Sequence, residues 1–366
     1  MTCSGVDDIV KSIFQRSLCT MSHTKHITRN KDHLQARADI LHHIREFFWQ
    51  KGFQEVETPL LVRLPGQEPY LSPIKLSVHS DKKISHDMYL HTSPEYTMKK
   101  MLGSGFGNIF SLCKTFRDYE SFGGAHNPEF TMLEWYRVGG TMFDLMDDVE
   151  ELLKVLLAKI EKLEACLPVG KVGGGKRETG NGEPVSGFKR LSMKDLWQQT
   201  IGINLDDYLA PSTMFTLCKQ RGYNVQDDES YEDLFYRIFL NEIEPTLLEG
   251  TYIIHHYPAP MAALAKMSET AQGYAERFEV YINGMEIANA FTELTDADEQ
   301  FKRLEAEQHL RKQLGKDIFD IDMDFIEALR HIPPCAGIAL GIDRLAQVLL
   351  GVKNIDDVLV LPMSKM

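Results

Sequence analysis

The spacing of apolar and polar residues predicts helices and strands that do not follow a regular βαβ alternation. Residues 32–51 carry apolar side chains at steps of three and four, including Leu34, Ile44 and Phe48, and Gly52 ends this amphipathic helix. Further helices are predicted over 94–103, 141–165, 192–200, 211–221, 230–242, 296–314, 322–331 and 341–350. Strands are predicted over 53–57, 88–93, 108–116, 128–138, 251–257, 277–294 and 336–341. We therefore expect an α+β fold with a mostly antiparallel sheet flanked by helices.

Side chains alternate between two faces along the predicted strand 128–138. One face combines an aromatic ring with a thioether, a carboxylate and a phenol, from Phe130, Met132, Glu134 and Tyr136. The opposite face, with Leu133 and Trp135, is typical of a core. Glu134 therefore belongs either to a site built beside an aromatic platform or to an amphipathic strand whose carboxylate is solvated.

The segment 277–294 is predicted to form a β-hairpin around a central Asn-Gly pair. A two-residue turn pairs Tyr281 with Glu286, which places Glu279 diagonally beside Glu286 on one face. Two such carboxylates suit a hard cation, and a solvated acidic face is the alternative. Glu293 lies on the opposite face of the strand unless a bulge intervenes.

Two arginines lie at positions that suit a phosphate group. Arg117 follows the predicted strand 108–116, and Arg344 begins the last predicted helix after a glycine-punctuated strand. Arginine side chains and helix N-termini both bind phosphate groups well. The Gly-rich segment 337–341 lacks the spacing of a Rossmann or P-loop motif, so simple packing of this turn is the alternative.

Composition narrows the class of protein. The 366 residues include 40 Lys and Arg against 53 Asp and Glu, for a net charge of −13. This balance argues against a broad nucleic-acid-binding surface, but it permits a local basic pocket. No apolar run approaches the roughly 20 residues of a membrane span, so no membrane segment is expected. Six cysteines without a Cys-x-x-Cys pair predict neither a zinc site nor a disulfide framework and favour a cytoplasmic protein.

Two segments stand apart from the predicted globular part. Residues 1–30 lack the apolar core of a signal peptide, and we assign them to a leader of undetermined role. Residues 168–190 contain seven glycines together with several Lys and Arg residues. Such a composition is typical of a flexible linker, so we predict a flexible insertion on the surface.

Three separated segments resemble the three signature motifs of class II aminoacyl-tRNA synthetases. They are the helix and following turn over 32–59, the strand–loop–strand over 116–136, and the Gly-rich turn and helix start over 337–344. Residues 91–95 and 286–294 resemble segments of the lysyl branch of that family. Because the five segments occur in the family's order, the resemblance implies a class II synthetase catalytic domain.

The implied catalytic domain covers residues 31–366 and leaves no room for the N-terminal OB domain with which lysyl-tRNA synthetases read the anticodon. Ala339 also replaces a glycine that is usual in the third motif. Both features resemble stand-alone paralogues of the lysyl branch, which activate a lysine isomer with ATP and transfer it to a lysine side chain of elongation factor P. The resemblance therefore implies ATP and Mg²⁺, lysine or (R)-β-lysine as substrate, elongation factor P as acceptor and a homodimer, and it disfavours tRNA.

The same resemblance assigns roles to individual residues. Arg117 and Arg344 are the expected catalytic residues, with Arg117 on the α-phosphate. ATP is expected to contact Arg117, Glu120, His126, Asn127, Phe130, Glu286, Ile287, Gly341 and Arg344. The lysine-like substrate is expected to contact Ser93, Pro94, Glu95, Glu134, Tyr136 and Glu293. Glu279 and Glu286 are expected to hold Mg²⁺ between the phosphates.

The second motif departs from the family pattern in its loop, residues 118–125. The loop is longer than the pattern, so Glu120 takes the adenine-contacting role, and Ala125 stands where an arginine is usual. Ala290 replaces a usual glycine in the later lysyl-type segment. The motif arginines and the metal-binding carboxylates remain, which favours an active enzyme. Two alternatives stay open: a lysyl-adenylate-forming enzyme with another acceptor (tRNA, a carrier or a small amine), and a non-catalytic regulatory paralogue.

Overall fold

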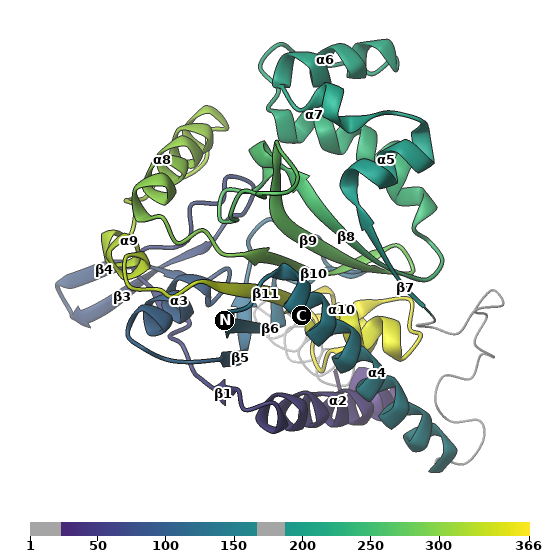
Figure 1. Cartoon of the computed structure of the whole chain (residues 1–366). Coiled ribbons are helices and arrows are strands. Elements are labelled where there is room, and N and C mark those ends of the chain that lie inside the picture. Colours follow the sequence, from purple (N-terminus) through teal and green to yellow (C-terminus); the bar gives the residue numbers. More distant parts are fainter. Residues whose placement is uncertain (1–22, 167–186) are drawn as a thin grey trace, which may run out of the picture.

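The computed structural model describes residues 23–166 and 187–366, and its centre is an eight-stranded sheet (Figure 1). In spatial order its strands are β1 (Gln54–Glu55), β5 (Ile109–Phe116), β6 (Glu129–Val138), β11 (Cys335–Gly341), β10 (Met285–Thr292), β9 (Tyr274–Ile282), β8 (Thr251–Pro258) and β7 (Phe188–Ser192). β1 runs parallel to β5 and β7 runs parallel to β8, whereas the other neighbours are antiparallel. The expected α+β class with a mostly antiparallel sheet is confirmed.

A smaller sheet of three strands has the order β2 (Leu61–Val62), β4 (Ile84–Leu90) and β3 (Ile74–Asp81). The sequence predicts a strand over 88–93, of which β4 contains the first part, but it does not predict β3. Most side chains of β3 and β4 are exposed on both faces. The alternating hydrophobic pattern that marks a half-buried strand is therefore missing from this hairpin.

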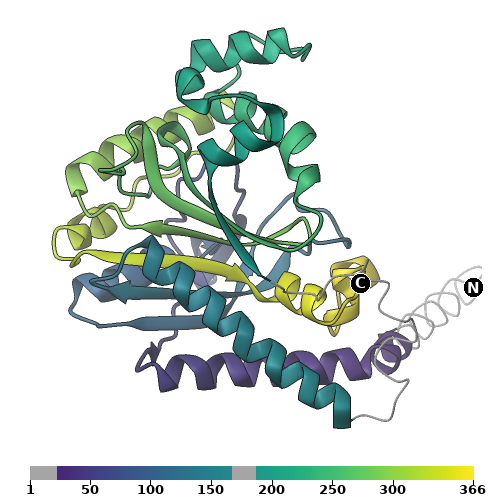
Figure 2. The same ribbon diagram turned by 45° about the vertical axis from the view of Figure 1, so that its right-hand side comes forward.

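Three helices cover one face of the main sheet: α2 (Lys31–Gln50), α4 (Met142–Cys166) and α10 (Ile342–Leu349). Figure 2 shows α4 (teal) descending at an oblique angle to α2 (purple), and the two helices contact each other. Their apolar stripes meet the inward-facing side chains of the strands, and the Phe48 ring of α2 lies 5.0 Å from the Trp135 ring of β6, between centroids. The apolar stripe of α2 is thus buried within the chain itself. Burial of each large apolar side chain contributes about 1.5–3 kcal/mol to the stability of the fold.

Two further groups of helices complete the fold. α3 (Glu95–Gly103), α8 (Ala297–Gln313) and α9 (Met323–Leu329) share one apolar core, and α5 (Met193–Ile201), α6 (Pro211–Gln220) and α7 (Tyr231–Ile238) form another with β8 and β9 (Figure 1). A π-helical turn, Phe239–Ile243, continues α7. Short 3₁₀ segments occupy Leu205–Tyr208, Glu244–Thr246, Ala259–Met261, Ile355–Val358 and Met363–Lys365.

The leader and the insertion expected from the sequence lie partly outside the described residues. These are residues 1–22 of the leader and most of the insertion, up to residue 186. Within the leader range, residues 23–29 are helical. The insertion ends earlier than expected, because residues 188–190 already pair in parallel with β8 as part of β7. Within the described ranges, no helix is long and apolar enough to cross a membrane.

Candidate active site

A cavity of about 330 Å³ opens on the sheet face opposite α2 and α4, over β6, β10 and β11. Most of the predicted site residues line it: Ser93, Glu95, Arg117, Glu120, His126, Asn127, Phe130, Glu134, Tyr136, Glu286, Ile287, Glu293, Gly341 and Arg344. Pro94 and Glu279 are not part of the lining. Segments from the second and third motifs and from both lysyl-type segments therefore converge on the cavity, whereas the helix of the first motif packs on the opposite face of the sheet.

Strand β6 supplies the floor of the cavity. The face predicted from side-chain alternation lines it, with Phe130, Met132, Glu134 and Tyr136 in order along the strand. Leu133 and Trp135 lie in the core on the other side, as predicted. Glu134 is only 2% exposed, so the alternative of a solvated carboxylate on an amphipathic strand is wrong.

Glu134 is held by two hydroxyl groups. Ser93 Oγ donates to Glu134 Oε2 (2.6 Å), and the Tyr136 hydroxyl donates to Glu134 Oε1 (2.7 Å). Desolvation, together with the nearby Glu95, raises the pKa of Glu134 to about 8. A cationic ligand beside this carboxyl would favour its ionised form.

Two more carboxylates share the same end of the cavity. Glu95 starts α3 and Glu293 directly follows β10, and both contact the buried ammonium group of Lys99. Burial raises the pKa of Glu293 to about 7. Lys99 was not identified from the sequence, although its i,i+4 spacing from Glu95 on a predicted helix is a signal for such a pair.

A β-bulge in the 277–294 hairpin decides which carboxylates share the cavity. Tyr281 pairs with Glu286, as predicted, but the register then shifts so that Ala288 pairs with Val280. The extra residue reverses the alternation of side chains beyond Glu286. Glu293 therefore lines the same cavity as Glu286, which resolves the question that strand parity left open.

Glu279 has a different environment from Glu286. It is 3% exposed, and its Oε2 accepts hydrogen bonds from the hydroxyls of Tyr257 (2.6 Å) and Tyr281 (2.7 Å), while Oε1 forms an ion pair with Arg277 (2.5 Å). The alternative of a solvated acidic face is wrong for this residue. The Glu286 side chain is 42% exposed and faces the cavity, and desolvation together with Glu279 raises its pKa to about 7.

Arg117 is the positive group at the other end of the cavity. Its guanidinium lies over the Phe130 ring, 5.1 Å from the ring centroid. The Nε atom is buried and has no hydrogen-bond partner among the described residues, and desolvation lowers the pKa of the side chain. A buried donor without a partner is costly, so this arginine is suited to an anionic ligand.

Arg344 is positioned from two sides. Its Nε donates to the Ala125 carbonyl oxygen (3.1 Å), and its Nη1 donates to the Glu286 carbonyl oxygen (3.0 Å). The preceding residue, Asp343, is buried and accepts hydrogen bonds from the Arg37 guanidinium of α2. This contact connects the start of α10 to α2. These contacts hold the guanidinium at the mouth of the cavity, where β10, α10 and the second-motif loop meet.

The remaining predicted contacts lie around the second-motif loop. His126 Nδ1 is 2.7 Å from Glu120 Oε2, and this hydrogen bond lowers the pKa of Glu120. The Asn127 amide is used structurally, because it donates to the Glu129 carbonyl oxygen and accepts from the backbone N–H of Met363. Pro94 lies just before α3 as its N-cap. The roles of these residues toward a ligand remain predictions.

A second cavity, of about 580 Å³, adjoins the first and shares Glu68, Ser93 and Glu95 with it. Glu68 was not identified from the sequence, since it lies in a loop without a regular pattern. Its Oε2 is buried and has no hydrogen-bond partner within residues 23–166 and 187–366, and Arg311 of α8 donates to its carbonyl oxygen (2.7 Å). The lining contains six acidic side chains, Glu68, Asp87, Glu95, Asp320, Asp322 and Asp324, and two basic ones, Arg63 and Lys100.

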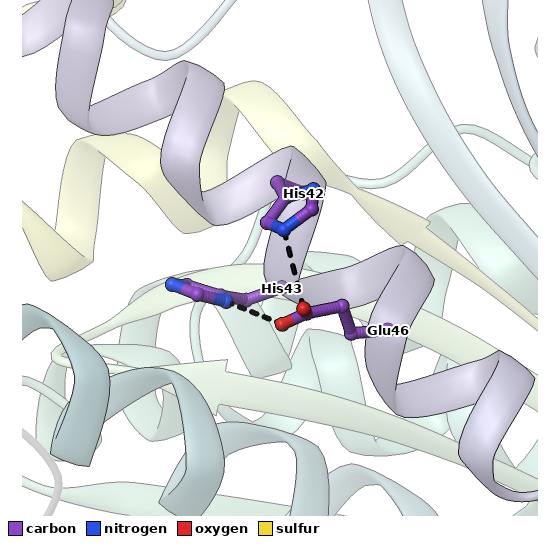
Figure 3. A group of neighbouring side chains, drawn as sticks. All are labelled: His42, His43 and Glu46. Atoms are coloured by element: carbon purple, nitrogen blue, oxygen red, sulfur yellow. Dashed lines mark hydrogen bonds and ion pairs between the residues drawn. The ribbon is translucent and has the colours of Figure 1, made fainter.

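One cluster with metal-ligand chemistry lies elsewhere, on α2. His42, His43 and Glu46 have donor atoms within 4.8 Å of one another, and no other such group of three occurs in the part of the chain that the structure describes. Figure 3 shows both imidazoles turned toward the one carboxylate, at 3.2 Å for His42 and 2.9 Å for His43. The cluster is not part of either cavity lining and is satisfied by its own contacts.

Comparison with known proteins places this geometry in a family. A family model described as tRNA synthetases class II (D, K and N) matches residues 21–365. Proteins called elongation factor P–(R)-β-lysine ligase are similar to this chain. The one from Avibacterium paragallinarum is 37% identical over 331 residues, covering 89% of this chain and 94% of the relative. The one from Histophilus somni (strain 2336) is 38% identical over 330 residues (89% and 93%), and the one from Pseudoalteromonas translucida is 35% identical over 336 residues (91% and 95%). The chain belongs to the class II tRNA synthetases, as the motif resemblance predicted, and is an enzyme of the ligase type.

Proposed function

We propose that this ligase activates (R)-β-lysine, or lysine, with ATP and transfers it to a lysine side chain of elongation factor P. One cavity with two chemically different ends carries the proposal. Three carboxylates, from Glu95, Glu134 and Glu293, lie at one end, and the guanidinium of Arg117, whose Nε has no partner among the described residues, lies at the other. Carboxylates bind ammonium groups and arginine binds phosphate, so the cavity suits a cationic amino acid beside a nucleotide.

In the proposed complex, ATP occupies the Arg117 end. Adenine would stack on the Phe130 ring, which lines the cavity and over which the Arg117 guanidinium also lies. Arg344 and His126 lie at the mouth of the cavity, with Arg344 Nη2 3.5 Å from His126 Nε2. Both side chains would contact the outer phosphates. Glu120 orients His126 through their hydrogen bond, and the contact of Glu120 with adenine stays a prediction.

The residues present fit a Mg²⁺ ion at Glu286. Its carboxylate faces the cavity, and desolvation together with the neighbouring Glu279 disfavours its ionised form, which a cation would stabilise. Glu279 would join such a site only by exchanging some of its contacts with Tyr257, Tyr281 and Arg277. When bound, the ion would neutralise charge on the phosphates during the displacement.

The proposed reaction has two steps. A carboxylate oxygen of the amino acid attacks the α-phosphorus, the new P–O bond forms as the bond to the β-phosphate oxygen breaks, and pyrophosphate leaves. Arg117 would stabilise the charge that develops on the α-phosphate oxygens. The neutral amine of the acceptor lysine then attacks the acyl carbon, an amide forms, AMP leaves and the amine releases a proton.

The acceptor is inferred from two observations. The relatives named above are called ligases of elongation factor P and (R)-β-lysine. The second cavity approaches Ser93 and Glu95 through a lining in which acidic side chains outnumber basic ones. Such a surface attracts the ammonium group of a lysine side chain and repels the phosphates of tRNA. Assembly as a homodimer stays a prediction, since the apolar stripe of α2 packs within the chain.

The transfer is tested by intact-mass spectrometry of elongation factor P. We expect incubation with the enzyme, ATP, Mg²⁺ and (R)-β-lysine to add the mass of one lysine residue. No gain should occur without ATP or when the acceptor lysine is replaced by arginine. Unmodified elongation factor P, in a reaction where adenylate does form, would contradict the acceptor and favour tRNA, a carrier or a small amine.

Amino-acid binding is expected to depend on pH because it needs ionised carboxylates. Desolvation raises the pKa of Glu134 to about 8 and that of Glu293 to about 7. A diammonium ligand favours the charged forms, so binding near pH 7 should release protons and affinity should rise as pH increases toward 8. Calorimetry in buffers of different ionisation enthalpy measures this release, which should weaken in Glu134→Gln. Binding without proton release in the wild type would contradict the expectation.

A further inference from the structure

A buried lysine lies behind the carboxylates of the amino-acid end, and the proposed reaction does not use it. Lys99 of α3 is 1% exposed, and its Nζ lies 2.6 Å from Glu95 Oε1 and 2.7 Å from Glu293 Oε2. Lysine is almost never fully buried unless it is paired. Burial alone would lower its pKa, but Glu293 and Glu95 reverse this effect and raise it above its ordinary value.

We propose that Lys99 is a positioning residue of the amino-acid site, whose ammonium group orients the Glu95 and Glu293 carboxylates toward a diammonium substrate. The inference rests on the proposed function, because it deepens the account of the same site. Each carboxylate has two oxygens, and Lys99 contacts one oxygen of each. The other oxygens remain for a ligand, and Glu293 Oε1 lies on the Gly337 side of the cavity.

The charges at this end support a dication over a monocation. Glu95, Glu134 and Glu293 are three acidic groups, and Lys99 supplies one fixed positive charge among them. Two further positive charges balance the three carboxylates when all are ionised. A lysine isomer brings two ammonium groups, whereas an amino acid with an apolar side chain brings one and leaves a buried carboxylate unpaired.

Several titratable groups face this carboxylate pair, and Lys99 is the only cation that contacts it among the described residues. They come from α3, β6, β11, α8, the residue after β10 and the loop that contains Glu68, and they are Glu68, Glu95, Tyr96, Lys99, Glu134, Tyr136, Glu293, Glu307 and Cys335. All except Lys99 are neutral or negative. Without the lysine, the two carboxylates would repel each other, and Glu293, whose pKa Lys99 lowers, would bind a proton at higher pH.

The test compares Lys99→Met with wild type in ATP–pyrophosphate exchange driven by lysine and (R)-β-lysine over pH 6–9. We expect kcat/KM for the amino acid to fall by about 10- to 100-fold near neutral pH, the range for a hydrogen-bonded charge. The acid limb of the pH profile should move up by about 1–3 pH units, so that the deficit shrinks at high pH. The KM for ATP should not change.

Control variants separate positioning from general structural support. Lys51→Met removes another lysine that bridges two carboxylates, Asp148 and Glu151, away from the cavity, and it should behave as wild type. Lys99→Arg keeps the charge and should restore part of the activity and the wild-type limb. Lys99→Gln serves in place of the methionine variant if that one does not fold.

The outcomes distinguish this inference from the proposed function. If kcat/KM for the amino acid falls equally at every pH in the Lys99 variants, or does not fall, the positioning role is overturned and lysine activation is not affected. A wild-type enzyme that neither binds nor activates any diamino acid would overturn the proposed function itself. A shifted limb with partial rescue by arginine would establish that Lys99 acts through the two carboxylates.

Discussion

Replacing Arg117 with alanine is expected to lower ATP–pyrophosphate exchange by about 10³-fold, the upper range for removal of one preorganised donor to a developing charge. The reason lies in its surroundings. The guanidinium stacks on Phe130, and its buried Nε has no partner in the part of the chain that the structure describes. The position of the side chain is therefore fixed, and its Nε is available to donate a hydrogen bond to an anionic ligand. Exchange with saturating amino acid, together with a thermal melt, measures the effect.

Two controls make the Arg117 result interpretable. Arg330→Ala removes a solvent-exposed arginine that pairs with Asp298 away from the cavity, and it should leave exchange unchanged. Arg117→Lys keeps a positive charge without the planar fork and should remain strongly impaired, because lysine does not reproduce bidentate phosphate contacts. Normal exchange in a folded Arg117→Ala enzyme would refute the phosphate role.

The second large effect is expected from Gly337→Ala in β11. A Cβ atom at this position would lie 2.3 Å from Tyr136 Cε1 and 2.4 Å from Glu293 Oε1, closer than real contacts allow. The phenol or the carboxylate must therefore move, and a displacement of this size costs about 100-fold in rate when it misplaces a substrate. Overpacking also costs about 1–3 kcal/mol of folding stability. Exchange kinetics and thermal unfolding measure the two consequences separately.

Gly107→Ala is the matched control for Gly337. The same methyl group added at Gly107 meets no atom within 4 Å, so activity and stability should stay close to wild type. We expect the Gly337→Ala defect to appear mainly in the KM for the amino acid, since Tyr136 and Glu293 both line that end of the cavity. An unchanged KM for lysine isomers would show that this end of the cavity does not bind the amino acid.

Much of the cavity was predictable because short-range rules govern it. Alternation along β6 placed Phe130 and Glu134 on one face, and the Asn-Gly turn paired Tyr281 with Glu286; both predictions are confirmed. These features need only the strand period and the geometry of a two-residue turn. The resemblance to the three motifs then grouped segments that are far apart in the chain, and the family match confirms it.

The features that were not predicted depend on long-range packing or on irregular backbone. Nothing in the sequence around Ile287 distinguishes a bulge from a regular strand, yet the bulge brings Glu293 to the cavity. The sequence alone predicts an exposed lysine at position 99 on the helix surface, because the burial of Lys99 depends on its contact with Glu293, which is far away in the chain. The contact between Arg37 and Asp343 likewise joins residues at opposite ends of the domain.

For Glu279 the sequence predicted the neighbouring residue Glu286 but not the hydrogen bonds that its carboxylate makes. The hairpin register placed it near Glu286, and electrostatic coupling between the two carboxylates agrees with that. Its oxygens, however, are already used by Tyr257, Tyr281 and Arg277, none of which follows from the spacing of two glutamates. The metal role of Glu279 therefore stays a prediction, whereas Glu286 presents its carboxylate to the cavity.

ATP–pyrophosphate exchange without tRNA, measured across (R)-β-lysine, lysine and amino acids with apolar side chains, tests lysine activation most directly. We expect exchange with the lysine isomers, strongest with (R)-β-lysine, and none with the apolar amino acids, because three carboxylates line the amino-acid end. Exchange limited to lysine would keep the activation step and reopen the question of the acceptor. No exchange with either isomer would contradict the proposed activity and favour a non-catalytic member of the family.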